Sequence, residues 1–99
     1  MTRIVIVELV GSFAEDKDVA GRLRREIILP ALAKVRKVQI DFAGITLATQ
    51  SFIHALIAEG LRRSGESALE LLEFKNCNDL VRGIIETVVQ YVLATTDTT

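Results

Sequence analysis

The apolar residues of this chain form three short strand-like runs. Residues 4–10 make a continuous run rich in β-branched side chains, which predicts a strand covered on both faces. Residues 37–42 alternate between apolar and polar side chains, the pattern of a strand with one buried face. Residues 69–74, which carry Leu69, Leu71, Leu72 and Phe74, are predicted to form a third strand. We therefore expect three strands.

A helix is predicted between the first two strands. Asp16 or Asp18 offers a side-chain oxygen to the free N–H groups at its start, and apolar residues then recur every four positions as far as Ala31. Pro30 lacks an N–H and clashes with the preceding turn. We therefore expect this helix either to kink near Ile27 or to restart as a short turn at Pro30.

Two further helices are predicted. One is capped by Thr49 or Ser51 and ends at residues 64–67. The other follows capping residues at 76–79 and carries pairs of apolar residues every four positions between residues 80 and 93. So wide an apolar stripe indicates that this last helix packs against more than one neighbour.

The elements alternate in the order strand, helix, strand, helix, strand, helix. This βαβαβα order predicts an α/β fold with right-handed crossovers and a small, mostly parallel sheet, with helices packed mainly on one face. The 99 residues suffice for one domain. We expect residues 1–94 to form this domain and residues 95–99, which have no apolar anchor, to be a disordered tail.

The composition argues against several classes of function. Twelve Lys and Arg residues face 13 Asp and Glu residues, so a net charge of −1 gives no electrostatic reason to bind nucleic acid or an anionic membrane. No run reaches the roughly 18 apolar residues of a spanning helix, and the N-terminus leads into a strand rather than a signal peptide. The single cysteine cannot form an intramolecular disulfide. We expect a cytoplasmic protein.

Side chains that carry catalysis are scarce. The one histidine, His54, stands three residues after Ser51, but no third group is evident to orient its ring, which disfavours a serine hydrolase. We instead place His54 on the exposed or partner-facing side of its helix, in line with Ala58 and Arg62. Nucleotide-binding motifs are absent and the carboxylates lack metal-ligand spacing, so we expect no metal, no cofactor and no enzymatic activity.

The most distinctive stretch runs from the second strand into the second helix. It places Thr49 and Ser51 in the first helical turn, where unpaired N–H groups and the helix dipole favour an anion. A phosphate on either hydroxyl would be compatible with the fold and would add about −1.5 to −2 charges. Two other interpretations stay open. The two residues are only N-caps, or a small ligand binds here or near Asn78.

This stretch resembles the STAS domain of bacterial anti-sigma-factor antagonists. Residues 40–45 (Ile-Asp-Phe-Ala-Gly-Ile) resemble a signature strand of that domain, and residues 47–54 (Leu-Ala-Thr-Gln-Ser-Phe-Ile-His) occupy the segment that follows it. Gly11 resembles the glycine that closes the corresponding first strand.

The similarity is closer to STAS-like domains of unknown function, small bacterial proteins with an Ala-Thr-Gln-Ser-Phe motif. Residues 41–57, 74–78 and 84–91 carry it, and it extends over about residues 7–91. In the antagonists, a partner kinase that is also the anti-sigma factor phosphorylates the second serine of an Asp-Ser-Ser-Gly motif. That serine falls on Ser51, whereas Thr49, Gln50 and Phe52 replace the other three residues.

The resemblance implies a non-enzymatic signalling adaptor with a phosphorylation site at Ser51. Its partner would be a histidine-kinase-like ATPase or an anti-sigma factor in a partner-switching mechanism. The expected partner-binding residues are Thr49, Gln50, Ser51, His54 and Ala58. The alternative is a dimerising structural subunit of a larger bacterial regulatory or defence complex, without phosphorylation.

The sheet edges favour association with another chain. Antagonists of the STAS fold have an additional strand near each end of the domain, and this chain shows no counterpart of either one. Three strands leave two edges uncovered, and open edges tend to pair. We therefore expect a homodimer or an obligate complex.

Overall fold

The computed structural model describes residues 2–96. Its strands are β1 (Thr2–Val5), β2 (Phe13–Ala14), β3 (Val38–Asp41), β4 (Leu47–Ala48) and β5 (Leu72–Lys75). Its helices are α1 (Val7–Val10), α2 (Lys17–Leu23), the π-helix η1 (Arg24–Ile28), α3 (Leu29–Ala33), α4 (Gln50–Ser64), α5 (Glu66–Leu71) and α6 (Asp79–Thr96).

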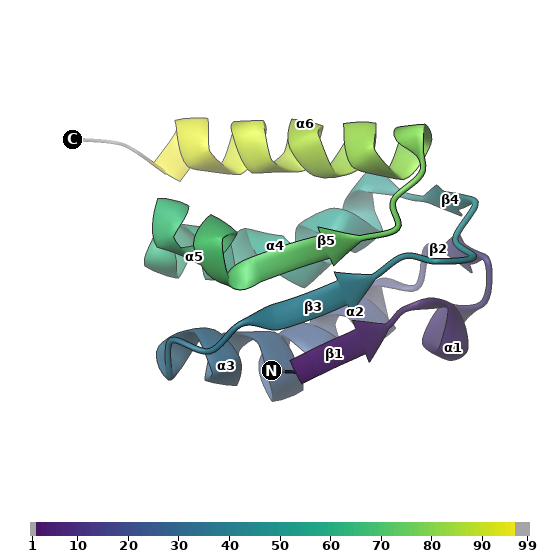
Figure 1. Cartoon of the computed structure of the whole chain (residues 1–99). Coiled ribbons are helices and arrows are strands. Elements are labelled where there is room, and N and C mark those ends of the chain that lie inside the picture. Colours follow the sequence, from purple (N-terminus) through teal and green to yellow (C-terminus); the bar gives the residue numbers. More distant parts are fainter. Residues whose placement is uncertain (1, 97–99) are drawn as a thin grey trace.

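The main sheet has three parallel strands in the order β1-β3-β5. Most helices lie behind this sheet or beyond its β5 edge, α1 lies past the carboxyl ends of the strands at the right, and the face turned toward the viewer in Figure 1 is open. A second, two-stranded parallel sheet joins β2 to β4. The predicted α/β fold, with a mostly parallel sheet and helices mainly on one face, is confirmed.

Alternation along the strands separates the core from solvent. Ile4, Ile40 and Leu72 point toward the helices and are buried, whereas Arg3, Gln39 and other polar residues occupy the open face. The helices complete the core with large apolar side chains that are fully buried, among them Ile28, Phe52, Leu56, Leu61, Val81 and Val88.

The first strand is shorter than predicted. β1 ends at Val5, and the chain turns through helical Ile6 into α1, whose residues Glu8 and Leu9 are exposed. The expectation of a strand through residue 10 with both faces covered is therefore wrong. The helical turn closes at Gly11, whose φ of 74° suits a residue without a side chain. The chain can thereby reverse at the carboxyl end of the sheet.

The first long helix has the predicted irregularity. Asp16 caps it by accepting bonds from the N–H groups of Asp18 and Val19. Its middle, η1, is a π-helical segment that contains Ile27, and Pro30 follows at the start of α3. A π-helix shifts the hydrogen-bond pattern by one residue, which is one way to continue a helix past a residue without an N–H.

The third strand begins later than predicted. Residues 69–71 belong to α5, and β5 covers only Leu72–Lys75. The reversal at Gly65 (φ 60°) starts α5 directly after α4, and Ala68 of α5 is buried. The last helix extends to Thr96, further than expected, and residues 97–99 of the expected tail lie outside the described residues.

Candidate functional site

Strand β4 delivers the chain to the start of α4. It pairs with β2, and the N–H of Thr49 donates to the carbonyl of Ala14 at 2.9 Å. Thr49 then caps the helix, because its hydroxyl oxygen accepts from the N–H of Phe52 at 3.1 Å. Of the two predicted caps, Thr49 serves this role, so the hydroxyl of Ser51 is left for other contacts.

Ser51 is the second residue of α4 and is exposed. The backbone N–H groups of Gln50 and Ser51 have no acceptor in the part of the chain that the structure describes. They therefore contribute to the positive end of the helix dipole. Phe52 is fully buried, so its ring does not block the approach to the Ser51 hydroxyl.

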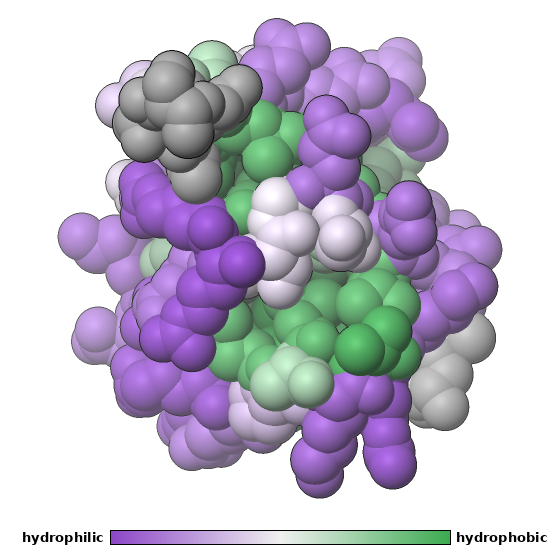
Figure 2. Space-filling view, turned by 90° about the vertical axis from the view of Figure 1, so that its left-hand side faces the viewer, coloured by the Kyte–Doolittle hydropathy of each residue, from purple (hydrophilic) through white to green (hydrophobic). Residues whose placement is uncertain are grey.

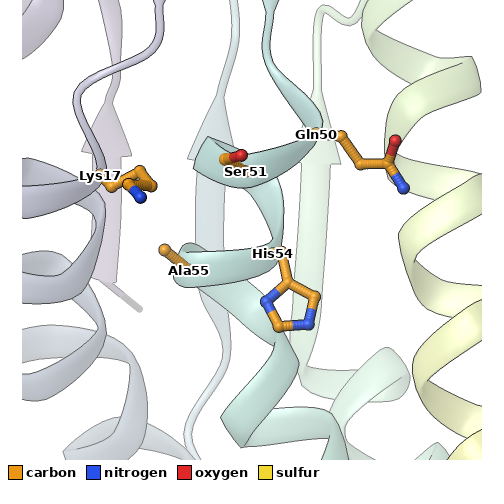
Figure 3. Close-up of a pocket in the computed structure, with 5 residues that line it drawn as sticks. All are labelled: Lys17, Gln50, Ser51, His54 and Ala55. Carbon is orange, nitrogen blue, oxygen red and sulfur yellow. The ribbon is translucent and has the colours of Figure 1, made fainter.

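A shallow hollow of about 460 Å³ adjoins Ser51. Its lining consists of Lys17, Gln50, Ser51, His54 and Ala55. Figure 3 shows that Lys17 comes from the first turn of α2 and faces the start of α4, whereas the Gln50 side chain points away toward α6. The hollow thus combines one ammonium group, one imidazole and one serine hydroxyl from the starts of two neighbouring helices.

Four of the five predicted partner-binding residues are accessible. Gln50 and Ser51 are exposed, and Thr49 and His54 are half-buried. Ala58 is only 2% exposed, so it cannot form part of an accessible surface. α4 packs against both α2 and α6, which leaves only a narrow accessible face.

An apolar patch that the sequence did not reveal lies at the same end of the molecule. We call Leu9, Phe13, Leu47 and Leu80 the apolar end; their exposed fractions are 46%, 44%, 40% and 63%. Figure 1 places the elements that carry them, α1, β2, β4 and the first turn of α6, together at the right.

Hydrogen bonds hold the elements of the apolar end together. The N–H of Thr46 donates to the carbonyl of Ser12 at 2.8 Å. The side-chain amide of Asn78 donates to the carbonyls of Ile45 and Thr46 at 3.2 and 3.0 Å. These bonds hold the start of α6 beside the segment that leads into β4. The patch therefore lies on a braced part of the fold.

Asp41 ties the carboxyl ends of the three main strands together. It is 2% exposed and accepts bonds from the Asn76 amide after β5, the Arg3 guanidinium on β1 and the N–H of Ala43. These bonds lower the pKa of Asp41 to about 2. Because all of its partners lie on the strands of the main sheet or directly after them, Asp41 has a structural role.

Residues 2–96 have neither a metal-binding cluster nor a membrane-spanning helix. No group of three or more His, Cys, Asp or Glu residues among them is placed to hold a metal ion. None of their helices is long and apolar enough to cross a membrane.

One of the comparisons with known proteins identifies a family. Neither the curated proteins nor the solved structures gave a match. The family model of the STAS-like domain of unknown function (DUF4325) matches residues 19–82, which include β3, β4, α4 and Ser51. The chain therefore belongs to this STAS-like family.

Proposed function

We propose that this protein is a non-enzymatic signalling adaptor that binds a partner protein at its apolar end, and that phosphorylation of Ser51 releases the partner. The observation that carries the proposal is an accessible serine at the same end of the molecule as an exposed apolar patch. Leu47 of the apolar end lies four residues before Ser51, and Thr49 braces the segment between them.

The apolar end has the composition of a binding surface. Large apolar side chains that cluster on a surface mark interaction sites more often than scattered ones do. Phe13 and Leu47 stand directly opposite each other on β2 and β4, so their side chains present a continuous apolar surface. Aromatic and aliphatic residues of this kind are typical anchors at the centre of protein interfaces.

Phosphorylation of Ser51 would act through charge. The free N–H groups of Gln50 and Ser51 and the nearby Lys17 would stabilise a phosphate in the isolated chain. The same phosphate would place a strongly hydrated dianion at the rim of the apolar end. A partner that covers this rim would have to desolvate it, so binding should weaken.

The partner class follows from the family resemblance. Anti-sigma-factor antagonists bind an anti-sigma factor that is also a histidine-kinase-like ATPase, and we propose a partner of this class. Two tests address it: mass spectrometry of the chain purified from its host, and binding to such an ATPase encoded beside it. We expect one phosphoryl group on Ser51 that disappears in Ser51→Ala, and at least about tenfold weaker binding by Ser51→Asp.

Ser67 supplies a matched control. It is exposed and is the second residue of α5, as Ser51 is of α4, but it belongs to another part of the surface. Ser67→Asp should leave partner binding unchanged. Equal binding by Ser51→Asp and the unmodified chain would refute the switch.

The alternative is a dimerising structural subunit in which a second copy covers the apolar end. The same patch of Phe13 and Leu47 would then be buried in a homodimer. Sedimentation velocity decides between the two: Phe13→Ser should convert a dimer to a monomer under the alternative. Under the switch proposal the chain sediments as a monomer, and Phe13→Ser weakens only the binding of the ATPase.

A further inference from the structure

The sheet is narrower than the layer of helices that covers it. Three adjacent strands span about 10 Å, because neighbouring strands lie about 4.8 Å apart. Three packed helices span about 16–20 Å, because their axes lie 8–10 Å apart. Here α4 packs between the α2–η1–α3 segment and α6. The helix layer must therefore overhang the sheet, and Figures 1 and 3 show α6 beyond the β5 edge.

A groove runs along the β5 edge beneath α6. It consists of two adjoining hollows of about 390 and 220 Å³ that share Phe74, Ile85 and Glu86. Leu69 and Val89 extend its apolar lining toward one end, and Cys77 lies at the other. Leu69 belongs to α5, and Figure 2 looks onto the side of the molecule where α5 lies in Figure 1, on which apolar residues surface between hydrophilic ones. The groove thus runs alongside β5.

The backbone N–H and C=O groups of Phe74 face this groove. The N–H of Phe42 donates to the carbonyl of Lys75 at 2.8 Å, so the Lys75 backbone faces β3. Backbone direction alternates along a strand, so the N–H and C=O of Phe74 face the opposite way. No described residue pairs with this side of β5. A backbone donor and acceptor therefore stand unpaired beside apolar side chains.

The charges on the open face of the sheet distinguish the two neighbours of Phe74. The Glu73 carboxylate lies 3.8 Å from the Lys37 ammonium and accepts from the Gln39 amide at 3.3 Å. The Lys75 side chain is exposed and has no carboxylate within ion-pair distance among residues 2–96. A strand added beside β5 would thus meet an unpaired positive charge at Lys75, whereas the negative charge of Glu73 is already compensated by Lys37.

We propose that the groove receives an extended segment of a partner protein, which adds a fourth strand to β5. The backbone of that segment pairs with the N–H and C=O of Phe74. One apolar side chain of the segment packs beside Phe74 against Ile85 and Val89. The neighbouring residue points to the open face, where an acidic side chain pairs with Lys75.

The overhang of α6 favours a lone strand over a second copy of the chain. Two copies that paired their β5 strands about a two-fold axis would carry their helices on the same side of the joint sheet. The α6 of one copy would then enter the space that the α4 of the other needs. A single extended segment places only its own side chains beneath α6.

A displayed library of random twelve-residue peptides, selected on the full chain, tests this proposal. We expect selected peptides to share an apolar residue next to an acidic one. Hydrogen exchange of the Phe74 amide should slow when such a peptide binds, whereas exchange of Glu73 and Lys75, which already pair with β3, should not change. Selection of no peptide, or binding without protection of Phe74, would overturn the proposal.

Variants locate the binding site. Val89→Glu places a charge in the groove and should weaken the selected peptides by about tenfold or more. Lys75→Glu should shift the selected pattern from acidic to basic residues. Arg62→Glu, an exposed change on α4 away from the groove, is the control and should alter neither result. A concentration-dependent dimer that Val89→Glu dissociates would show that a second copy fills the groove, and would contradict the proposal.

Discussion

The guanidinium of Arg3 donates a hydrogen bond to the carboxylate of Asp41 across 38 residues of sequence, and so joins β1 to β3. Asn76, after β5, donates to the other carboxylate oxygen at 3.0 Å. One buried carboxylate therefore holds all three strands of the main sheet at their carboxyl ends. This geometry makes the stability of the sheet depend on the charge of Asp41.

The first prediction concerns acid pH. The folded chain lowers the pKa of Asp41 from 3.8 to about 2, because Asn76, Arg3 and the Ala43 N–H all favour the ionised form. The stabilisation is fully present above the unfolded value and is lost as the pH falls through the folded value. Asp41→Asn should lower the urea midpoint at pH 7, and the deficit should shrink between pH 4 and pH 2.

Arg3→Met is the comparison for this prediction. It removes one of the three donors and keeps the bonds from Asn76 and Ala43. Its urea midpoint at pH 7 should therefore fall between those of the unmodified chain and Asp41→Asn. A deficit of Asp41→Asn that is the same at pH 7 and pH 2 would mean that the charge of Asp41 does not stabilise the sheet.

The second prediction concerns Asn78, which acts in two ways. Its oxygen caps α6 by accepting from the N–H of Val81 at 2.8 Å, and its amide donates to the carbonyls of Ile45 and Thr46. Asn78→Ala removes both and should lower the free energy of unfolding by about 1–3 kcal/mol in urea titrations. Asn78→Asp keeps the oxygen that caps α6 but lacks the amide donor, so the decrease in its free energy of unfolding should be smaller.

Gln90→Ala, an exposed change elsewhere on α6, should have little effect and serves as the control for Asn78. If Asn78→Asp were as stable as the unmodified chain, the bonds to Ile45 and Thr46 would not contribute. The apolar end would then lack the brace that we assign to it.

The elements that were predicted correctly have strong local signals. The alternation around β3 and the polar cap before α4 are visible in a few adjacent residues, and both predictions are confirmed. Residues 4–10 show the opposite case. Their β-branched side chains favour a strand locally, yet the pairing of β1 with β3 ends at Val5 and the chain must turn there. The constraint that the strand pairing places on the chain here overrides the strand preference of the β-branched residues.

The candidate site was predictable only in part. Ser51 and His54 follow from a short motif and lie on one hollow. Phe13 and Leu47 are far apart in the sequence, and only the pairing of β2 with β4 brings them together. These two-residue strands carry no periodic signal, so the apolar end could not be found from the sequence. Ala58 was predicted to be accessible but is buried, because α4 is covered on two sides. The spacing of apolar residues within a single helix does not reveal how many neighbours that helix has.

The third prediction concerns the thiol of Cys77. Partial burial is the main effect that raises its pKa, and Arg82 opposes it through its positive charge. A smaller thiolate fraction at neutral pH should make alkylation by iodoacetamide several-fold slower than that of free cysteine. In urea the rate should rise to that of free cysteine. Equal rates in the folded and unfolded chain would contradict the burial of Cys77 at the end of the β5 groove.

The last prediction concerns the contact between α4 and α3. A Cβ atom on Gly60 would lie 2.8 Å from Cδ1 of Leu32, which is itself buried, so Leu32 would have to move. A Cβ atom on Gly83 of α6 would meet nothing within 4 Å. Gly83→Ala should therefore stabilise the chain by about 0.5–1 kcal/mol, because alanine is the better helix former.

Gly60→Ala gains the same stabilisation from helix preference, but overpacking against Leu32 destabilises the chain by more, because overpacking costs about 1–3 kcal/mol in a well-packed core. Its free energy of unfolding should therefore fall below that of Gly83→Ala by about this amount. Adding Leu32→Ala to Gly60→Ala separates crowding from other causes, because the new methyl group then has room. If Leu32→Ala cost the same in both backgrounds, Gly60 and Leu32 would not be coupled and the close approach of the two helices would not depend on glycine.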